Sequence, residues 1–177
     1  MQKPFCFHLS AFTSLMAFCF LLSALSLTSC TPNANLQGRG EVYLQGEWQQ
    51  DTIPKEKQLL QYSIYHFKFS CDSVFIQINS VSKVNNGPDT CMRSGHWSEY
   101  VKGTYQQRSD TLHIRGQFCN ADYSLKPEGG CFRSGIYEDL FLTRKKGDSV
   151  IQFLSASNVI PINTHLIKRT GCSPKPL

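Results

Sequence analysis

The amino-acid sequence predicts an all-β fold, organised as a single antiparallel up-and-down barrel of about eight strands. Apolar and polar residues alternate with a period of two along much of residues 41–177, and many of the apolar ones are β-branched or aromatic. Turn-forming residues separate these segments. No segment of this region has a convincing helical stripe, although residues 55–61 are expected to form a short helical turn.

The predicted strands follow one another at short intervals. They cover residues 44–49, 62–69, 74–79, 97–105, 111–118, 137–144, 150–154 and 163–168. Closing them into a barrel removes exposed sheet edges, and a barrel of this size is either filled by side chains or holds one small ligand. The residues expected in its interior are Trp48, Phe67, Phe69, Ile76, Ile78, Leu112, Ile114, Phe141 and Leu154.

Two sequence repeats mark the ends of strands. In the first repeat an aspartate precedes a hydroxyl residue, at Asp72, Asp110 and Asp148, and such aspartates close tight turns by capping their own backbone. In the second, Cys-x-Arg-Ser-Gly occurs at residues 91–95 and 131–135, each time just before a strand that contains an aromatic residue. A shared device for starting a strand, with glycine at positive φ, is favoured over a duplicated binding element.

Residues 1–29 are predicted to be a lipoprotein signal peptide. Lys3 provides a positive start, residues 9–27 are uncharged, and Leu27-Thr28-Ser29-Cys30 forms a lipobox. A single membrane-spanning helix and an ordinary secretion signal are the alternatives. The lipobox favours attachment of lipid, such as palmitate, to Cys30. Two or more acyl chains there would give a stable membrane anchor.

Residues 30–40 are expected to form a lipidated, flexible tether that leads into a barrel domain at residues 41–177. The tether segment has no apolar periodicity and contains two glycines. Thr31 follows the lipidated cysteine and does not resemble the Asp-based signal that retains lipoproteins in the inner membrane. An outer-membrane location in the cell envelope is therefore expected, with the leaflet left open.

Charge gives no indication of a nucleic-acid partner. The formal net charge of the whole chain is +5, and it falls by one without residues 1–29, which hold one lysine and no acidic residue. Basic residues are spread along the rest of the chain, apart from Arg144-Lys145-Lys146, which we interpret as a solvated strand end.

The cysteines that follow Cys30 predict two disulfides, because the exported chain reaches an oxidising compartment. Successive connections of an up-and-down barrel alternate between its two ends, and paired Cα atoms must lie within about 7 Å. Cys71 and Cys172 then meet at one end, whereas Cys91, Cys119 and Cys131 lie at the other. The predicted pairs are Cys71–Cys172 and Cys91–Cys131, with Cys119 free and Cys119–Cys131 as the second choice.

The segment Leu44-Gln45-Gly46-Glu47-Trp48 resembles the opening of lipocalin-like domains. This resemblance implies that Trp48 lies across the closed end of the barrel. The chain after the signal peptide is also similar to a group of small lipoproteins of the Bacteroidota. The matching stretches are residues 35–38, 44–48, 59–62, 67–69, 71–74, 130–133 and 172–177.

Some members of this group carry the name fumarate hydratase, an activity that the sequence does not support. The Gly-Ser-Ser-x-Met-Pro-x-Lys-x-Asn loop of class II fumarases is absent. Class I enzymes hold an iron–sulfur cluster through three thiolates, which need a reducing cytosol. The cysteines of an exported chain would meet oxidising conditions instead.

The sequence contains no convincing catalytic, metal or phosphate motif, so no enzyme, cofactor or metal is expected. One strand face is a candidate for contact with a ligand. If this face is interior, Glu99 is a buried carboxylate that needs a partner such as Arg93 or Arg133. If the register is reversed, Glu99 is solvated. The candidate ligand-facing residues are Trp97, Glu99, Val101 and Tyr105.

Two functions remain open from the sequence. The first is a membrane-anchored barrel that binds a small apolar or amphipathic ligand. The alternative is a protein-binding module with a filled barrel, acting as an inhibitor or an accessory subunit of an envelope complex. Residues 134–137 resemble the Ser-Gly-x-x-Tyr motif of periplasmic lysozyme inhibitors, with one spacer missing. An open apolar cavity would favour the first function, and a filled interior the second.

Lipid attachment is testable at Cys30, the thiol that follows the lipobox. Cys30→Ala should release the protein from membranes or leave the precursor uncleaved, because the acylated side chain is lost. Metabolic labelling with a palmitate analogue, followed by membrane fractionation, measures both effects. Labelling that persists in the alanine variant would contradict the assignment.

Overall fold

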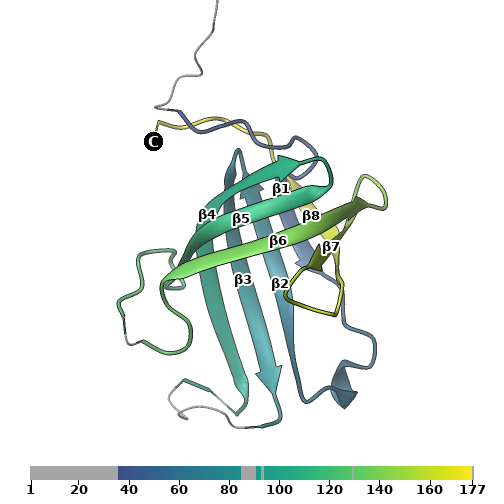
Figure 1. Cartoon of the computed structure of the whole chain (residues 1–177), viewed down its shortest axis with the longest axis vertical. Helices are drawn as coiled ribbons and strands as arrows, with labels where there is room; N and C mark the ends of the chain where they lie inside the picture. Colours follow the sequence, from purple (N-terminus) through teal and green to yellow (C-terminus); the bar gives the residue numbers. More distant parts are fainter. Residues whose placement is uncertain (1–35, 85–90, 93, 129, 177) are drawn as a thin grey trace, which may run out of the picture. The chain divides into compact units, whose positions relative to one another are not determined.

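The computed structural model describes residues 36–84, 91, 92, 94–128 and 130–176. Within them, eight antiparallel strands close into one barrel in sequence order, which confirms the predicted fold (Figure 1). A 3-10 turn at Glu56–Gln58 matches the predicted helical turn, and no described helix is long and apolar enough to cross a membrane. The strands are β1 (Gly46–Gln50), β2 (Gln61–Ser70), β3 (Ser73–Ser82), β4 (His96–Arg108), β5 (Thr111–Cys119), β6 (Ile136–Lys145), β7 (Val150–Ser155) and β8 (Ile162–Arg169).

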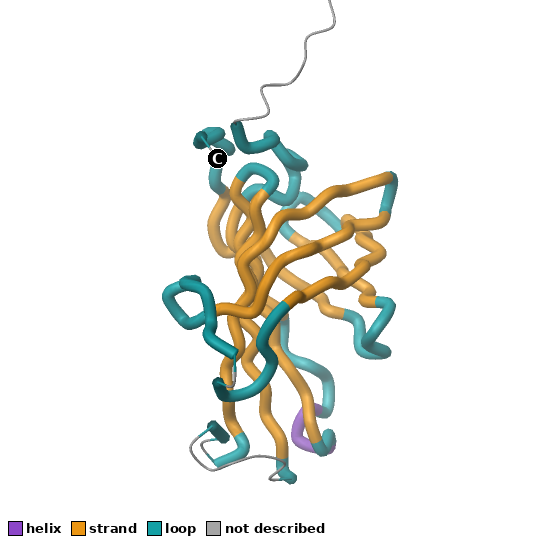
Figure 2. The backbone as a smooth tube through the Cα atoms, turned by 60° about the vertical axis from the view of Figure 1, so that its left-hand side comes forward, coloured by secondary structure: helices purple, strands orange, loops and turns teal. Residues whose placement is uncertain are grey.

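The two ends of the barrel differ in the length of their connections (Figure 2). Short turns join β2 to β3, β4 to β5 and β6 to β7 at one end, where the segments before β1 and after β8 also lie. We call this the closed end. The opposite, open end carries the connections from β1 to β2, β3 to β4, β5 to β6 and β7 to β8.

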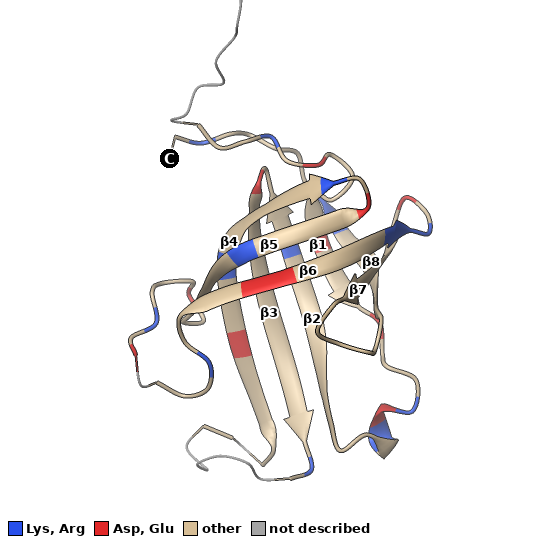
Figure 3. Ribbon diagram, in the orientation of Figure 1, with Lys and Arg blue, Asp and Glu red and all other residues tan. Residues whose placement is uncertain are grey.

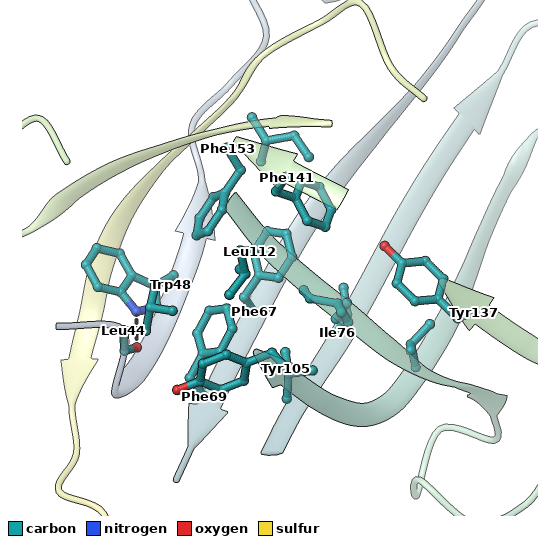
Figure 4. Packing of buried hydrophobic residues seen from close by; sticks show 14 of the residues in the cluster. Leu44, Trp48, Phe67, Phe69, Ile76, Tyr105, Leu112, Tyr137, Phe141 and Phe153 are labelled. Carbon is teal, nitrogen blue, oxygen red and sulfur yellow. Dashed lines mark hydrogen bonds between the residues drawn. The ribbon is translucent and has the colours of Figure 1, made fainter. Parts of the chain in front are cut away.

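The core consists of large aromatic and branched side chains on the inner faces of the strands (Figure 4). Phe67 lies near its centre, with ring centroids 5.0 Å from Phe153 and 6.1 Å from Phe141. Burial of such side chains is the dominant favourable contribution to folding. All of the predicted interior residues except Leu154 are buried, namely Trp48, Phe67, Phe69, Ile76, Ile78, Leu112, Ile114 and Phe141.

The prediction for Leu154 is wrong, because its neighbour Phe153 points inward instead. Phe153 is fully buried, whereas Leu154 is only half-buried and pairs with Leu142 on the outer face. Apolar residues occupy both faces of β7, since Val150 and Leu154 lie outside and Ile151 and Phe153 inside. Alternation of polarity therefore carries no register information in this strand.

Trp48 is completely buried beside the segment that leads into β1. Its indole N–H donates to the carbonyl oxygen of Leu44 over 2.7 Å. The guanidinium of Arg169, at the end of β8, lies 5.5 Å from the Trp48 ring and donates to the carbonyl oxygen of Tyr43 over 2.7 Å. This cation–π contact and hydrogen bond tie the last strand to the first, where the barrel closes.

The glycines of the repeated Cys-x-Arg-Ser-Gly elements share one backbone conformation. Gly95 has φ +81° and Gly135 has φ +83°, which confirms the positive φ expected of both glycines. A Cβ atom at Gly95 would also lie 2.1 Å from the carbonyl oxygen of Ser82, whereas the position at Gly135 is open. The two elements are therefore alike in backbone conformation but not in packing.

Both predicted disulfides are confirmed. Cys71 is bonded to Cys172 at the closed end with Cα atoms 4.7 Å apart, and Cys91 is bonded to Cys131 at the open end with Cα atoms 5.4 Å apart. Cys119 is a buried free thiol among the described cysteines. Each disulfide links connections on the same end of the barrel, as the alternation of an up-and-down fold requires.

Residues 36–40 do not form a free tether, contrary to the expectation for this part of residues 30–40. Gln37 donates its backbone N–H to the carbonyl oxygen of Lys175, and Leu36 forms an isolated bridge with Pro176. The amide of Gly38 donates to Asp72 Oδ2 over 2.8 Å. The chain thus meets its own C-terminal segment over the closed end (Figure 1). Residues 30–35, and the expected signal peptide and Cys30, lie outside the described residues.

Candidate functional site at the open end

The interior of the barrel changes from apolar to mixed along its axis. Phe67, Phe69 and Phe141 fill the half nearer the closed end. Towards the open end, the inward positions of β2 and β3 become hydroxyl and amide side chains, including Ser63 and Ser80, whose Oγ atoms lie 2.7 Å apart. The barrel is therefore filled at one end and polar at the other.

A hollow of about 470 Å³ lies in this polar half, and we call it the mouth hollow. Aromatic and polar side chains from three strands and the β5–β6 connection surround it. This mixture gives both an apolar contact surface and hydrogen-bonding groups, as small-molecule sites commonly have. Its described lining residues are Gln61, Ser63, Tyr65, Ser80, Trp97, Glu99, Phe132 and Arg133.

Glu99 and Arg133 form an ion pair in the wall of the mouth hollow, in which the carboxylate is buried and the guanidinium is exposed. Arg133 donates from Nε to Glu99 Oε1 over 3.0 Å and from Nη2 to Oε2 over 2.7 Å, a two-pronged geometry. Its backbone N–H also donates to Oε1 over 3.1 Å. The Glu99 side chain is 5% exposed and that of Arg133 is 55% exposed. The arginine therefore compensates the buried carboxylate and still faces the solvent.

The protonation of Glu99 is set by the balance between burial and Arg133. Burial by itself would raise the pKa of this carboxyl, because it disfavours the charged form. The hydrogen bonds and charge of Arg133 outweigh burial, so the pKa of Glu99 lies below its ordinary value. Hydrogen bonding to Glu99 in turn raises the pKa of Arg133. Both groups are therefore charged at neutral pH.

The β5–β6 connection reaches the site because β5 is shorter than β4. Cys119, the last residue of β5, pairs with Tyr100, so Trp97 and Glu99 have no neighbour on β5. Phe132 stacks on Trp97 with ring centroids 5.0 Å apart and planes 11° apart. The connection thus supplies to the end of β4 the contacts that a longer β5 would have made.

A second polar cluster lies on the inner side of β6. Asp139 accepts hydrogen bonds from the hydroxyl of Ser155 at 2.9 Å and from its own neighbour, the Leu140 amide, at 2.9 Å. Burial raises the pKa of Tyr137, and the negative charge of Asp139 adds to this effect. Burial likewise raises the pKa of Tyr65. Both phenols therefore stay neutral, and the Tyr137 hydroxyl donates to Asp139 Oδ2 over 3.5 Å.

The predicted ligand-facing residues divide between the hollow and the core. All four lie on the inner face, which settles the register of β4 that the sequence left open. Trp97 and Glu99 line the mouth hollow, whereas Val101 and Tyr105 are buried in the filled half. Of the two partners considered for Glu99, Arg133 binds it, and Arg93 lies outside the described residues.

Sequence reasoning missed Phe132 and the β2 residues Ser63 and Tyr65 as parts of the site. The second Cys-x-Arg-Ser-Gly element was the available signal for Phe132, because this copy has an aromatic residue between its cysteine and its arginine. The alternation that places Phe67 and Phe69 inside also places Tyr65 and Ser63 on the inner face, but it does not mark them as part of a site. The register of the β2–β3 hairpin brings Ser63 opposite Ser80.

A larger hollow of about 650 Å³ lies between β4 and the β5–β6 connection and shares Ser80, Trp97 and Phe132 with the mouth hollow. Its polar side chains are partly occupied with one another, since Asn79 Oδ1 accepts hydrogen bonds from Ser98 Oγ at 2.7 Å and from Gln77 Nε2 at 3.0 Å. The described residues hold no cluster of His, Cys, Asp and Glu side chains placed to bind a metal ion.

Comparisons with known proteins found no relative of this chain. No family model, no curated protein and no solved structure matches the chain. The fold and the mouth hollow define it as a small, disulfide-linked, closed up-and-down β-barrel with one open polar end. Any function must be argued from these features.

The lowered pKa of Glu99 predicts a pH-dependent contribution to stability. A carboxyl with a lower pKa in the folded state stabilises the fold above its unfolded pKa, and this contribution is lost as the pH falls through the folded pKa. The difference in unfolding free energy between wild type and Glu99→Gln should therefore shrink between about pH 6 and about pH 3. Urea titrations monitored by fluorescence measure it, with Glu128→Gln on the same connection as control. A difference that is constant with pH would contradict the prediction.

Proposed function

We propose that the protein is a lipid-anchored, non-enzymatic binding protein of the bacterial cell envelope, whose ligand occupies the mouth hollow. The observation that carries this proposal is the division of the interior into a filled half and an open, mixed half. A filled core leaves no deep apolar cavity for a long hydrocarbon chain. The ligand is therefore small and amphipathic and binds at the mouth.

The walls of the mouth hollow match such a ligand. The stacked pair of Trp97 and Phe132 offers a flat apolar surface. Arg133 is bound to Glu99 through Nε and Nη2 and is more than half exposed, so it presents polar donors beside this surface. Gln61 and Ser63 face the same hollow from β2. An apolar ring on the aromatic pair and a polar group towards β2 would satisfy both kinds of surface.

Anchoring rests on the lipobox at Cys30 and on where the described chain begins. Leu36 lies at the closed end, and six residues of chain after Cys30 can span at most about 20 Å. Lipid on Cys30 would therefore attach through the closed end and leave the open end unobstructed. The two disulfides suit export to an oxidising compartment. An outer-membrane location remains part of the proposal.

A second candidate function, protein binding, is favoured by the surface of the open end. Each of its four connections carries a large apolar side chain that is exposed: Leu60, Val84, Leu125 and Val159. An exposed apolar surface marks a protein contact where its residues form one patch. Charged residues are scattered over the described surface without a large patch of one sign, so nucleic acid is not proposed as a partner (Figure 3).

The two tryptophans of the chain allow a direct test of ligand binding. Trp97 lines the mouth hollow, whereas Trp48 is fully buried in the core. Native mass spectrometry of the full-length protein from its own envelope should reveal a retained small molecule. Adding that molecule back to stripped protein should change the fluorescence of wild type and leave that of Trp97→Phe nearly unchanged.

Trp48→Phe is the matched control and should keep the response of the wild type. A response that survives in Trp97→Phe but vanishes in Trp48→Phe would move the ligand out of the mouth hollow. Protein that retains nothing and shows no response would contradict small-ligand binding and leave protein binding as the function.

A further inference from the structure

Strands β1 and β2 separate before β2 reaches the open end. Their pairing runs from Gly46 opposite Phe69 to Gln49 opposite His66 and stops there. The chain after β1 stays with β8 instead, since the Asp51 amide donates to the carbonyl oxygen of Asn163 over 2.8 Å. Residues 61–65 of β2 are consequently paired with β3 on one side and have no strand partner among the described residues on the other.

At Tyr65, the residue where this edge begins, a side chain takes the place of the missing strand. The Tyr65 amide donates to Gln50 Oε1 over 2.9 Å, so a side-chain carbonyl fills the position of a backbone acceptor. Residues two apart in a strand present their N–H and C=O groups to the same side. The backbone N–H and C=O groups of Ser63 and Gln61 therefore point to the same side as the Tyr65 N–H. The Gln50 side chain bonds to Tyr65 and not to these two residues.

The free edge lacks the features that usually protect one. Natural proteins block exposed edges with charged residues, above all lysine, with proline or with a bulge. Residues 61–65 read Gln-Tyr-Ser-Ile-Tyr and contain neither charge nor proline, and their pairing with β3 continues without a bulge. This edge is thus able to accept another strand.

Space is present beside the edge. A hollow of about 250 Å³ is lined by Gln61 and Ser63 of this edge, by Gln50 and Ile53, and by Ile160 of the β7–β8 connection. Gln61 and Ser63 also line the mouth hollow. The backbone of a strand placed along β2 would therefore lie in the 250 Å³ hollow, and its inward side chains would enter the mouth hollow.

We propose that the mouth binds an extended peptide segment of a partner protein, which adds as a strand to the free edge of β2. This inference rests on the second candidate function, protein binding, and names the kind of segment that is bound. Backbone hydrogen bonds to Ser63 would provide affinity, and pockets for alternate side chains would provide selectivity. The inward side chain meets Tyr65, Trp97 and Phe132 beside an ion pair that is already neutralised, so it is aromatic or aliphatic and uncharged.

The test uses the full-length protein and a phage-displayed library of random peptides as the probe. A selected peptide, synthesised free, should lose more affinity for Ser63→Pro than for Ser63→Ala, because both variants lose the hydroxyl and only alanine keeps the backbone N–H. Ser63→Pro should weaken binding by about tenfold or more, since proline removes the N–H that faces the groove. That N–H does not face β3, so the ladder between β2 and β3 is kept, and thermal unfolding verifies the fold.

N-methylation of the peptide gives an independent readout that does not depend on a folded variant. Methyl groups at alternate residues should abolish binding, and those at the intervening residues should have little effect, because only every second amide pairs with β2. Unchanged affinity for folded Ser63→Pro, a methylation profile without alternation, or a library that yields no peptide would overturn the inference. If no peptide is selected while a retained small molecule still perturbs Trp97, the peptide inference fails and the proposed function stands.

Discussion

The backbone of Cys71 is the point on which the closed end depends. Its carbonyl oxygen accepts hydrogen bonds from the Tyr105 hydroxyl and from Gln45 Nε2, both at 2.8 Å, and its N–H donates to Gln45 Oε1 at 2.7 Å. Its side chain is bonded to Cys172. One residue at positive φ thus joins the approach to β1, the β2–β3 turn, β4 and the C-terminal segment. Cys71, Gln45 and Tyr105 are all buried, so loss of the Gln45 side chain would leave the Cys71 N–H without its acceptor.

This concentration of contacts at one end leaves the other end with fewer constraints. β2, β3 and β4 are long, whereas β1 and β7 are short, and the pairing of β1 with β2 stops before β2 reaches the open end. The ion pair of Glu99 with Arg133 and the stacking of Phe132 on Trp97 replace the missing part of β5. Nothing comparable follows Gln50 along β2 among the described residues, and the free edge results.

The sequence predicted those features that depend on alternation and topology. Phe67 and Phe69 alternate cleanly with polar neighbours, and the pairing of Cys71 with Cys172 follows from which end each connection must occupy. The register of β7 failed because apolar residues occupy both faces. The contact of Gln37 with Lys175 could not be predicted, because nothing in the sequence of either segment indicates that the two meet. The separation of β1 from β2 at Gln50 could not be predicted either, because a side chain replaces the strand there without changing the alternation of β2.

Native-state hydrogen exchange of individual amides tests most directly whether the barrel is fixed at its closed end and incompletely paired at its open end. The Cys71 amide, buried and bonded to Gln45, should exchange only through global unfolding. The Ser63 amide, on the unpartnered edge of β2, should exchange far faster through local opening. Equal protection of the two amides, or a better protected Ser63, would contradict the account.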